Sequence, residues 1–145
     1  MTAPVWKLLA LTSLLAAQSP PSPYQKWLDE DVAYIVQPAE RAAFLRLTTN
    51  EERERFIEQF WLRRDPTPAT VENERKEEHY RRIAYANERF GDSVDGWKTK
   101  RGRFYILFGP PDEIETHPGK KESWRYWKLE GVGENITVEF DLTGK

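Results

Sequence analysis

The stretch from residue 96 to residue 113 separates two parts of the chain that differ in sequence pattern. Its central run, Arg103–Phe108, is rich in aromatic and branched apolar residues and therefore predicts a β-strand. The turn Gly109-Pro110-Pro111 follows, and neither proline can donate to a strand ladder, so the strand is expected to end there. Before this stretch the pattern favours helices, and after it the pattern favours strands.

A short helix is expected at Tyr24–Leu28, and three longer helices follow it before residue 96, each with its own start signal. Pro38 suits the first turn of a helix, where its missing N–H is not needed. Thr49 followed by Glu52 is a capping-box pattern. Thr70 is expected to cap the longest helix, and Gly91 is expected to end it in the left-handed conformation. The expected ranges are Pro38 to about Leu47, Thr49 to about Arg64, and Val71 to Phe90.

The apolar residues of the last two helices recur with the helical period and so predict which face of each helix is buried. In the second helix they form one continuous stripe, and in the third they follow the 3.6-residue repeat. The residues expected to be buried are Phe56, Ile57, Phe60 and Trp61 in the second helix, and Tyr80, Ile83, Ala84, Asn87 and Phe90 in the third.

Two groups of charged residues in the helical part could bind a ligand. Arg63 and Arg64 could hold an anion, but 24 acidic residues are available as partners, so ion pairs within the chain are the favoured interpretation. His79 lies among glutamates such as Glu74 and Glu78, which could suggest a metal site. A helical zinc site needs two histidines four residues apart, and His79 has no such partner. We therefore expect no metal and no cofactor.

Two strands are expected after the Gly-Pro-Pro turn, at residues 124–127 and 136–140. Both alternate between apolar and polar positions. Residues 112–115 lead into a polar loop that runs through Lys121. With Arg103–Phe108, the two strands predict a three-stranded antiparallel meander covered by the helices, which is an α+β fold. The residues expected to face inward are Trp124 and Tyr126 in the first strand and Ile136, Val138 and Phe140 in the second.

Charge and cysteine content exclude several classes of function. The chain has 22 basic and 24 acidic residues and a formal net charge of -2, which leaves no electrostatic footprint for nucleic acid. It has no cysteine, so disulfides, thiol catalysis and cysteine-based zinc sites are excluded. The oligomeric state has no signature in the sequence.

The amino terminus has the pattern of an export signal. The apolar run Leu8–Ala17 follows a single basic residue, Lys7, and is too short to span a bilayer. A secretory signal peptide over residues 1–18 is the favoured interpretation, and an uncleaved apolar start is the alternative. Residues 19–23 then form a stiff proline-rich linker, and residues 24–145 a single domain. We expect an exported, periplasmic or extracellular protein with no transmembrane span in its mature chain.

Many short motifs occur in order between residues 24 and 141. They include Glu51–Ile57, Phe60-Trp61, Arg63–Pro68, Tyr85–Phe90, Gly96-Trp97 with Thr99, Arg101-Gly102 and Gly109–Asp112. Together they resemble the GWxTD-domain family of bacterial proteins. The family is largely uncharacterised and occurs in proteins with export signals, so the resemblance implies a fold and a location but no activity. Lys100 stands where the family has the aspartate that names its motif. The family domain usually extends past the last strand, so we expect this chain to be truncated.

Two functions from different classes are compatible with this sequence. The favoured one is a non-catalytic binding or assembly module of the cell envelope, with an envelope protein as its partner. The alternative is a hydrolase that uses carboxylates near Asp112 and Glu113, although adjacent residues of an extended chain point to opposite faces. Trp97 is expected to anchor the long helix to the strand. The residues expected to form or support a contact surface, here called the signature residues, are Trp97, Thr99, Arg101, Gly102, Gly109, Pro110, Pro111 and Asp112.

Overall fold

The computed structural model of the protein describes residues 22–143. The predicted signal peptide, residues 1–18, lies outside the described residues. The elements run in the order α1 (Pro23–Lys26), the π-helical turn η1 (Trp27–Asp31), α2 (Pro38–Leu45), α3 (Asn50–Leu62), α4 (Glu74–Phe90), the 3₁₀ turn η2 (Gly96–Lys98), α5 (Lys100–Phe108), β1 (Glu113–His117), β2 (Lys121–Leu129) and β3 (Gly133–Asp141).

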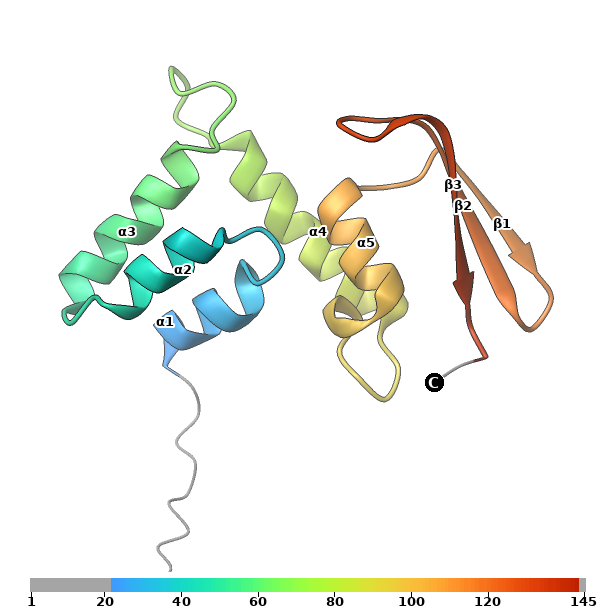
Figure 1. The fold of residues 1–145 in the computed structure, drawn as a ribbon, viewed down its shortest axis with the longest axis horizontal. Helices are drawn as coiled ribbons and strands as arrows, with labels where there is room; N and C mark the ends of the chain where they lie inside the picture. The colour runs from blue at the N-terminus through green and yellow to red at the C-terminus, as the bar shows by residue number, and fades with distance from the viewer. Residues whose placement is uncertain (1–21, 144–145) are drawn as a thin grey trace, which may run out of the picture.

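Helix α4 divides the described part of the chain into two halves, as Figure 1 shows. Helices α1, α2 and α3 lie on one side of it, and α5 and the sheet lie on the other. The predicted α+β class, with helices preceding a small antiparallel sheet, is confirmed. Within residues 22–143, none of the helices combines the length and the apolar character that crossing a bilayer requires.

Local capping chemistry sets the helix starts, and one predicted cap was wrong. Thr49 caps α3 as expected, since its hydroxyl oxygen accepts a hydrogen bond from the Glu52 N–H. The cap of α4 is Asn73 rather than Thr70, because the Asn73 side chain accepts from the Lys76 N–H. Gly91 ends α4 in an extended conformation, with φ of -72°, so the expected left-handed terminator was also wrong.

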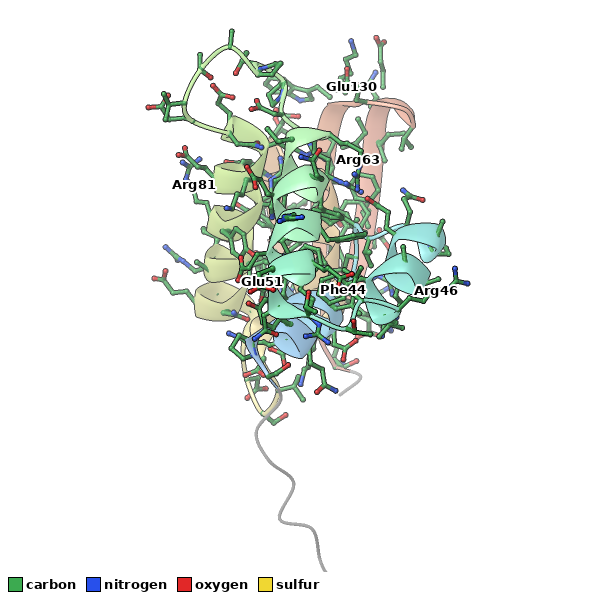
Figure 2. The ribbon with its side chains drawn as sticks, turned by 90° about the vertical axis from the view of Figure 1, so that its left-hand side faces the viewer. Phe44, Arg46, Glu51, Arg63, Arg81 and Glu130 are labelled. Atoms are coloured by element: carbon green, nitrogen blue, oxygen red, sulfur yellow. The ribbon has the colours of Figure 1, made fainter. Side chains whose placement is uncertain are left out.

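One hydrophobic core, here called the helical core, fills the space between α3 and the segments that precede it. Phe44 of α2 is buried in it and points toward α3, whereas Arg46 points away (Figure 2). The stripe predicted for α3 is confirmed, with Phe60 and Trp61 buried and the other two residues packed beside them. The buried residues of the helical core are Trp27, Leu28, Val32, Phe44, Phe60 and Trp61.

A second core, here called the sheet core, joins the end of α4 and helix α5 to β2 and β3. Helix α4 contacts both cores, with His79 buried beside Trp61 near its start and Phe90 in the sheet core at its end. The prediction of a single buried face for α4 was therefore partly wrong. Of the residues predicted to be buried, Ala84 and Asn87 are exposed. The buried residues of the sheet core are Ala86, Phe90, Tyr105, Ile106, Trp124, Tyr126, Leu129 and Phe140.

The strand predicted at Arg103–Phe108 was wrong, because these residues belong to α5. Thr99 caps this helix through a hydrogen bond from the Gly102 N–H to its hydroxyl oxygen, 3.0 Å long. The buried residues of the run, Tyr105 and Ile106, follow Gly102 by three and four residues, which is one face of a helix. Burial of that face against the sheet outweighs the strand preference of the individual residues.

The sheet has the predicted antiparallel meander topology, but its first strand is a different segment. Strand β1, Glu113–His117, forms from residues read as the start of a polar loop, and all five of its residues are exposed. Its only apolar residue is Ile114, so hydrophobic alternation gave no signal for it. The predictions for the other two strands are confirmed: Trp124 and Tyr126 of β2 are buried, and they pair with Val138 and Ile136 of β3.

Candidate functional site

The signature residues from Trp97 to Gly102 lie where α4, η2 and α5 approach one another at backbone distance. A Cβ atom added to Gly96 would lie 1.9 Å from the carbonyl oxygen of Ala86 in α4. One added to Gly102 would lie 1.8 Å from the carbonyl oxygen of Gly96. Both distances are far inside van der Waals contact, so only glycine permits this stacking of three backbones.

Thr99 and Trp97 fix the turn between these backbones. The Thr99 hydroxyl donates to the Gly96 carbonyl over 2.7 Å while it caps α5. The Trp97 N–H donates to Asn87 of α4, and the Trp97 carbonyl accepts from the Tyr34 hydroxyl over 2.7 Å. Trp97 is half-buried and tilted against the Tyr34 ring, so it links α4 to the segment before α2 and not to a strand.

Arg101 attaches α5 to the sheet through Glu122, a buried acid on β2. The Glu122 residue is 8% exposed, and its carboxylate accepts from the Trp124 indole N–H at 2.5 Å. Its other oxygen lies 3.4 Å from the Arg101 guanidinium, which also lies over the Phe90 ring. A buried carboxylate needs such partners, because an unpaired charge in a core is costly. We did not predict Glu122, although its alternation with Trp124 and Tyr126 on β2 was a usable signal.

The turn from Gly109 to Asp112 joins α5 to the sheet by hydrogen bonds. Gly109 has φ of 83°, a conformation that favours glycine, and its carbonyl accepts from the buried Tyr126 hydroxyl over 2.8 Å. The Asp112 carboxylate accepts from the Trp127 N–H over 2.7 Å. Pro110 is exposed and Pro111 is half-buried between them. The signature residues thus lie at the two ends of α5, and most have an internal partner.

Lys100 occupies the first position of α5, beside a hollow of about 390 Å³. The hollow opens between the η2–α5 turn and the end of β3. Its walls carry both signs of charge over an apolar floor, and they include Lys98, Lys100, Arg101, Asp92, Asp141, Phe90 and Phe140. Such a mixed lining gives the hollow no single preference for anions or cations.

The two carboxylates of the alternative hydrolase hypothesis, Asp112 and Glu113, do not form a catalytic pair. Asp112 bonds to the Trp127 backbone, whereas Glu113 pairs with Arg125 over 3.5 Å on the exposed sheet. His79 belongs to the helical core, where its Nε2 atom lies 2.6 Å from the Asp31 carbonyl oxygen and burial lowers its pKa. Within residues 22–143, no three acidic or histidine side chains are grouped to hold a metal ion.

The two arginines after α3 form ion pairs within the chain, as favoured from the sequence. The Arg63 and Arg64 guanidinium groups lie 2.9 Å and 2.7 Å from the Glu40 carboxylate. The Arg64 guanidinium also lies 3.6 Å from the centre of the Phe60 ring. These partners lower the pKa of Glu40 to about 2, chiefly through the Arg64 hydrogen bond. The pair therefore closes the helical core and is not a free anion site.

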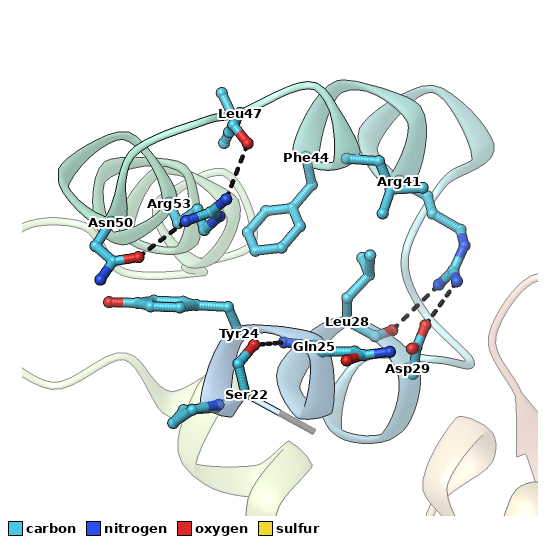
Figure 3. Close-up of a pocket in the computed structure, with 12 residues that line it drawn as sticks. Ser22, Tyr24, Gln25, Leu28, Asp29, Arg41, Phe44, Leu47, Asn50 and Arg53 are labelled. Atoms are coloured by element: carbon cyan, nitrogen blue, oxygen red, sulfur yellow. Dashed lines mark hydrogen bonds and ion pairs between the residues drawn. The ribbon is translucent and has the colours of Figure 1, made fainter. Parts of the chain in front are cut away.

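A larger hollow, of about 600 Å³, lies among α1, α2 and the start of α3 and was not predicted (Figure 3). Leu28 and Phe44 form its apolar wall, and Tyr24 lies along one side. The cations at its rim are already engaged, because Arg41 pairs with Asp29 over 2.6 Å and Arg53 donates to Asn50 and to the Leu47 carbonyl. The hollow is open, and its cations are already engaged by neighbouring groups of the chain.

A family model described as the GWxTD domain matches residues 11–145, nearly the whole chain. No curated protein and no solved structure matches the chain. The match covers all the signature residues and both cores, so these contacts are those of the matched domain.

Proposed function

The chain belongs to the GWxTD domain family, and from that premise we propose that it is a non-catalytic binding or assembly module of the bacterial cell envelope. The signature residues support this proposal because their described contacts are internal. Gly96 and Gly102 permit backbone contact, and Arg101 pairs with a buried acid. Residues with this role stabilise the fold, so a partner would be bound by other residues on the protein surface.

The exposed sheet is the observation that carries the proposal. All of β1 is exposed, and neither β1 nor β3 has a second strand neighbour among residues 22–143. Two large apolar side chains of the sheet are also exposed, one on each face: Ile114, on the face of its partner Trp124, is 53% exposed, and Trp127, on the opposite face, is 58% exposed. Open strand edges and exposed aromatic residues are features through which proteins bind other chains.

Export of the protein is proposed from the sequence of residues 1–18. Lys7 followed by the apolar run Leu8–Ala17 has the composition of a secretory signal. The absence of cysteine from the chain agrees with a protein that needs no disulfide to fold after export. A partner in the envelope follows from that location.

The proposal is tested by a pull-down from envelope extract, with the chain produced from its complete gene as bait. We expect one protein to be retained by the wild type and lost from a bait with Ile114→Ser and Trp127→Ser. The matched control carries Leu45→Ser and Val71→Ser, which change exposed apolar residues of the helical half. It should retain the partner.

Equal retention by all three baits would contradict the proposed surface, and retention of nothing would contradict the module. In the second case, turnover of a substrate that is abolished by Asp112→Asn would favour the carboxylate hydrolase. Circular dichroism and thermal melting of each bait show that the surface changes leave the fold intact.

A further inference from the structure

The two edges of the sheet differ in how they are protected against pairing with another chain. Figure 1 shows β2 between the two edge strands. Strand β1 has five residues, two of them glutamates. It follows Pro110-Pro111 and precedes Pro118. Short length, charge and flanking proline are the usual means by which proteins block strand addition.

Strand β3 lacks two of these protections, short length and proline, although it carries Glu134, Glu139 and Asp141. It has nine residues and no proline, and its segment Ile136–Phe140 has high strand propensity. Within residues 22–143, its only strand neighbour is β2. A long edge without proline is a template for another strand.

The hydrogen bonds identify which backbone groups β3 presents at its free edge. The Leu142 N–H donates to the Lys120 carbonyl over 2.9 Å, one step beyond the pairing of Asp141 with Lys121. Residues of an antiparallel strand alternate between the two neighbours. The even-numbered residues Ile136, Val138 and Phe140 therefore bond to β2. Thr137 and Glu139 direct their N–H and C=O groups to the free edge.

We propose that β3 pairs antiparallel with β3 of a second copy of this chain, with Val138 on the two-fold axis. The inference rests on the proposed assembly function and names the partner. In this register Thr137 exchanges both backbone hydrogen bonds with the second copy's Glu139, and Glu139 does the same with the second copy's Thr137. Two such pairs give four hydrogen bonds across the axis.

The side chains select this register over its neighbours. On the inner face Val138 meets Val138, and Ile136 meets Phe140, so the apolar face of one sheet continues into the other. Moving the axis to Glu139 would place two glutamates directly opposite each other, which is destabilising. Moving it to Thr137 would set Glu139 against Asn135, whose φ of 53° departs from strand geometry.

The proposed interface closes on itself. An antiparallel pair of identical edges is isologous, so both β3 edges are used in a dimer. The remaining edges belong to β1, whose short length and flanking prolines oppose further addition. The expected product is a dimer with one six-stranded sheet and not a fibre.

The first test measures the oligomeric state by sedimentation equilibrium, with the protein produced from its complete gene. The wild type is expected to be a dimer. Glu139→Pro removes one outward N–H from each copy and no bond to β2, and should raise the dimer dissociation constant by about 30-fold. Thr116→Pro is the matched control on β1, because its neighbours Glu115 and His117 bond to β2 while Thr116 faces outward. It should leave the dimer unchanged.

The second test needs no proline and fixes the register. The chain has no cysteine, so a single introduced thiol reports on one position. Val138→Cys should form an intermolecular disulfide on mild oxidation, because the two residues face each other across the axis. Ile136→Cys should not, because its two copies lie several residues apart.

A wild type that is monomeric at all concentrations would overturn the proposal, as would a dimer unaffected by Glu139→Pro and not crosslinked through Val138→Cys. If Glu139→Pro does not fold, judged by circular dichroism, the cysteine pair decides alone. A monomer that still retains an envelope protein through Ile114 and Trp127 would leave the proposed function intact and remove only the self-pairing.

Discussion

The helical core and the sheet core are held together by different means. In the helical core, Trp27 packs its ring against Phe44 and Phe60, each with a centroid distance of 5.1 Å. The sheet core also has aromatic packing, and two further features stabilise it. These are the close backbone contacts at Gly96 and Gly102, and the buried acid Glu122. The first core is held by side-chain packing, whereas the second also needs two glycines at backbone contact and a paired buried acid.

This difference explains where the family motif lies. Its glycines and its threonine cap fall at the contact of α4, η2 and α5, where a single added atom would collide with backbone. A motif with that role defines the scaffold of the sheet half, and it does not itself identify a ligand. Binding should then be sought on the exposed strands, and changes in the two halves should have different consequences.

The largest effect is expected for Gly102→Ala in the sheet half. The new Cβ would overlap the Gly96 carbonyl carbon and oxygen, so α5 would have to move away from η2. We expect a loss of more than about 3 kcal/mol in the free energy of unfolding, measured by urea denaturation. Gly131→Ala is the control, because that glycine has open space and only its φ of 79° opposes alanine. It should cost about 1 kcal/mol, and equal losses would refute the close-contact explanation.

The next effect is a pH dependence that belongs to the helical half. Glu40 has a folded-state pKa of about 2 against an ordinary 4.5. Its ionised form therefore stabilises the fold, fully above about pH 5, and this contribution is lost as the pH falls from about 4.5 toward 2. The shift corresponds to about 3 kcal/mol. Urea denaturation of the wild type and of Glu40→Gln should differ by this amount at pH 7 and converge near pH 2.

The control for this prediction is Glu58→Gln, an exposed glutamate of α3 that makes no ion pair within the described residues. Its unfolding curve should follow that of the wild type at every pH. A constant difference between wild type and Glu40→Gln across the whole range would show that the carboxylate's charge is not what Arg63 and Arg64 require.

A smaller effect is expected for Glu122 in the sheet half. Glu122→Ala removes the acceptor of the buried Trp124 N–H, and an unsatisfied buried donor of this kind costs about 2 kcal/mol. Glu122→Gln keeps an acceptor for Trp124 and should lose about half as much, measured by the same denaturation. If both variants lost the same stability, the ion pair with Arg101 would be the important contact and the hydrogen bond would not.

The parts of the fold that could be predicted are those with local signals. Thr49 caps its own helix, and Phe60 and Trp61 follow one helical period, so neither prediction needed the rest of the chain. The sheet strands β2 and β3 alternate cleanly for the same reason. Helix α5 was missed because its buried face is set by packing against α4 and the sheet, contacts that no local pattern shows.

The candidate site could be located from the sequence but its role could not. The resemblance pointed to Arg101 and Asp112, yet their partners come from β2, twenty-one and fifteen residues away. Strand β1 was missed because it pairs through its backbone and has only Ile114 as an apolar residue. An edge strand without a hydrophobic pattern can therefore be predicted only when the position of the strand it pairs with is known.

The smallest effect is expected at Lys100, where this chain departs from the motif of its family. Lys100 and Arg101 place two positive charges in the first turn of α5, which has no acid to match the positive end of the helix dipole. Lys100→Asp should therefore stabilise the protein by about 0.5 kcal/mol in low salt. The opposing contribution comes from Asp141, whose pKa is lowered first by hydrogen bonds from Thr143 and only last by Lys100. Since Asp141 is exposed and its interaction with Lys100 is screened, the helix dipole should prevail.

Lys100→Asn should give a stability between those of the wild type and Lys100→Asp, and 1 M salt should reduce the differences in stability among the three proteins. A less stable Lys100→Asp would instead show that the lysine's attraction to the end of β3 holds α5 against the sheet.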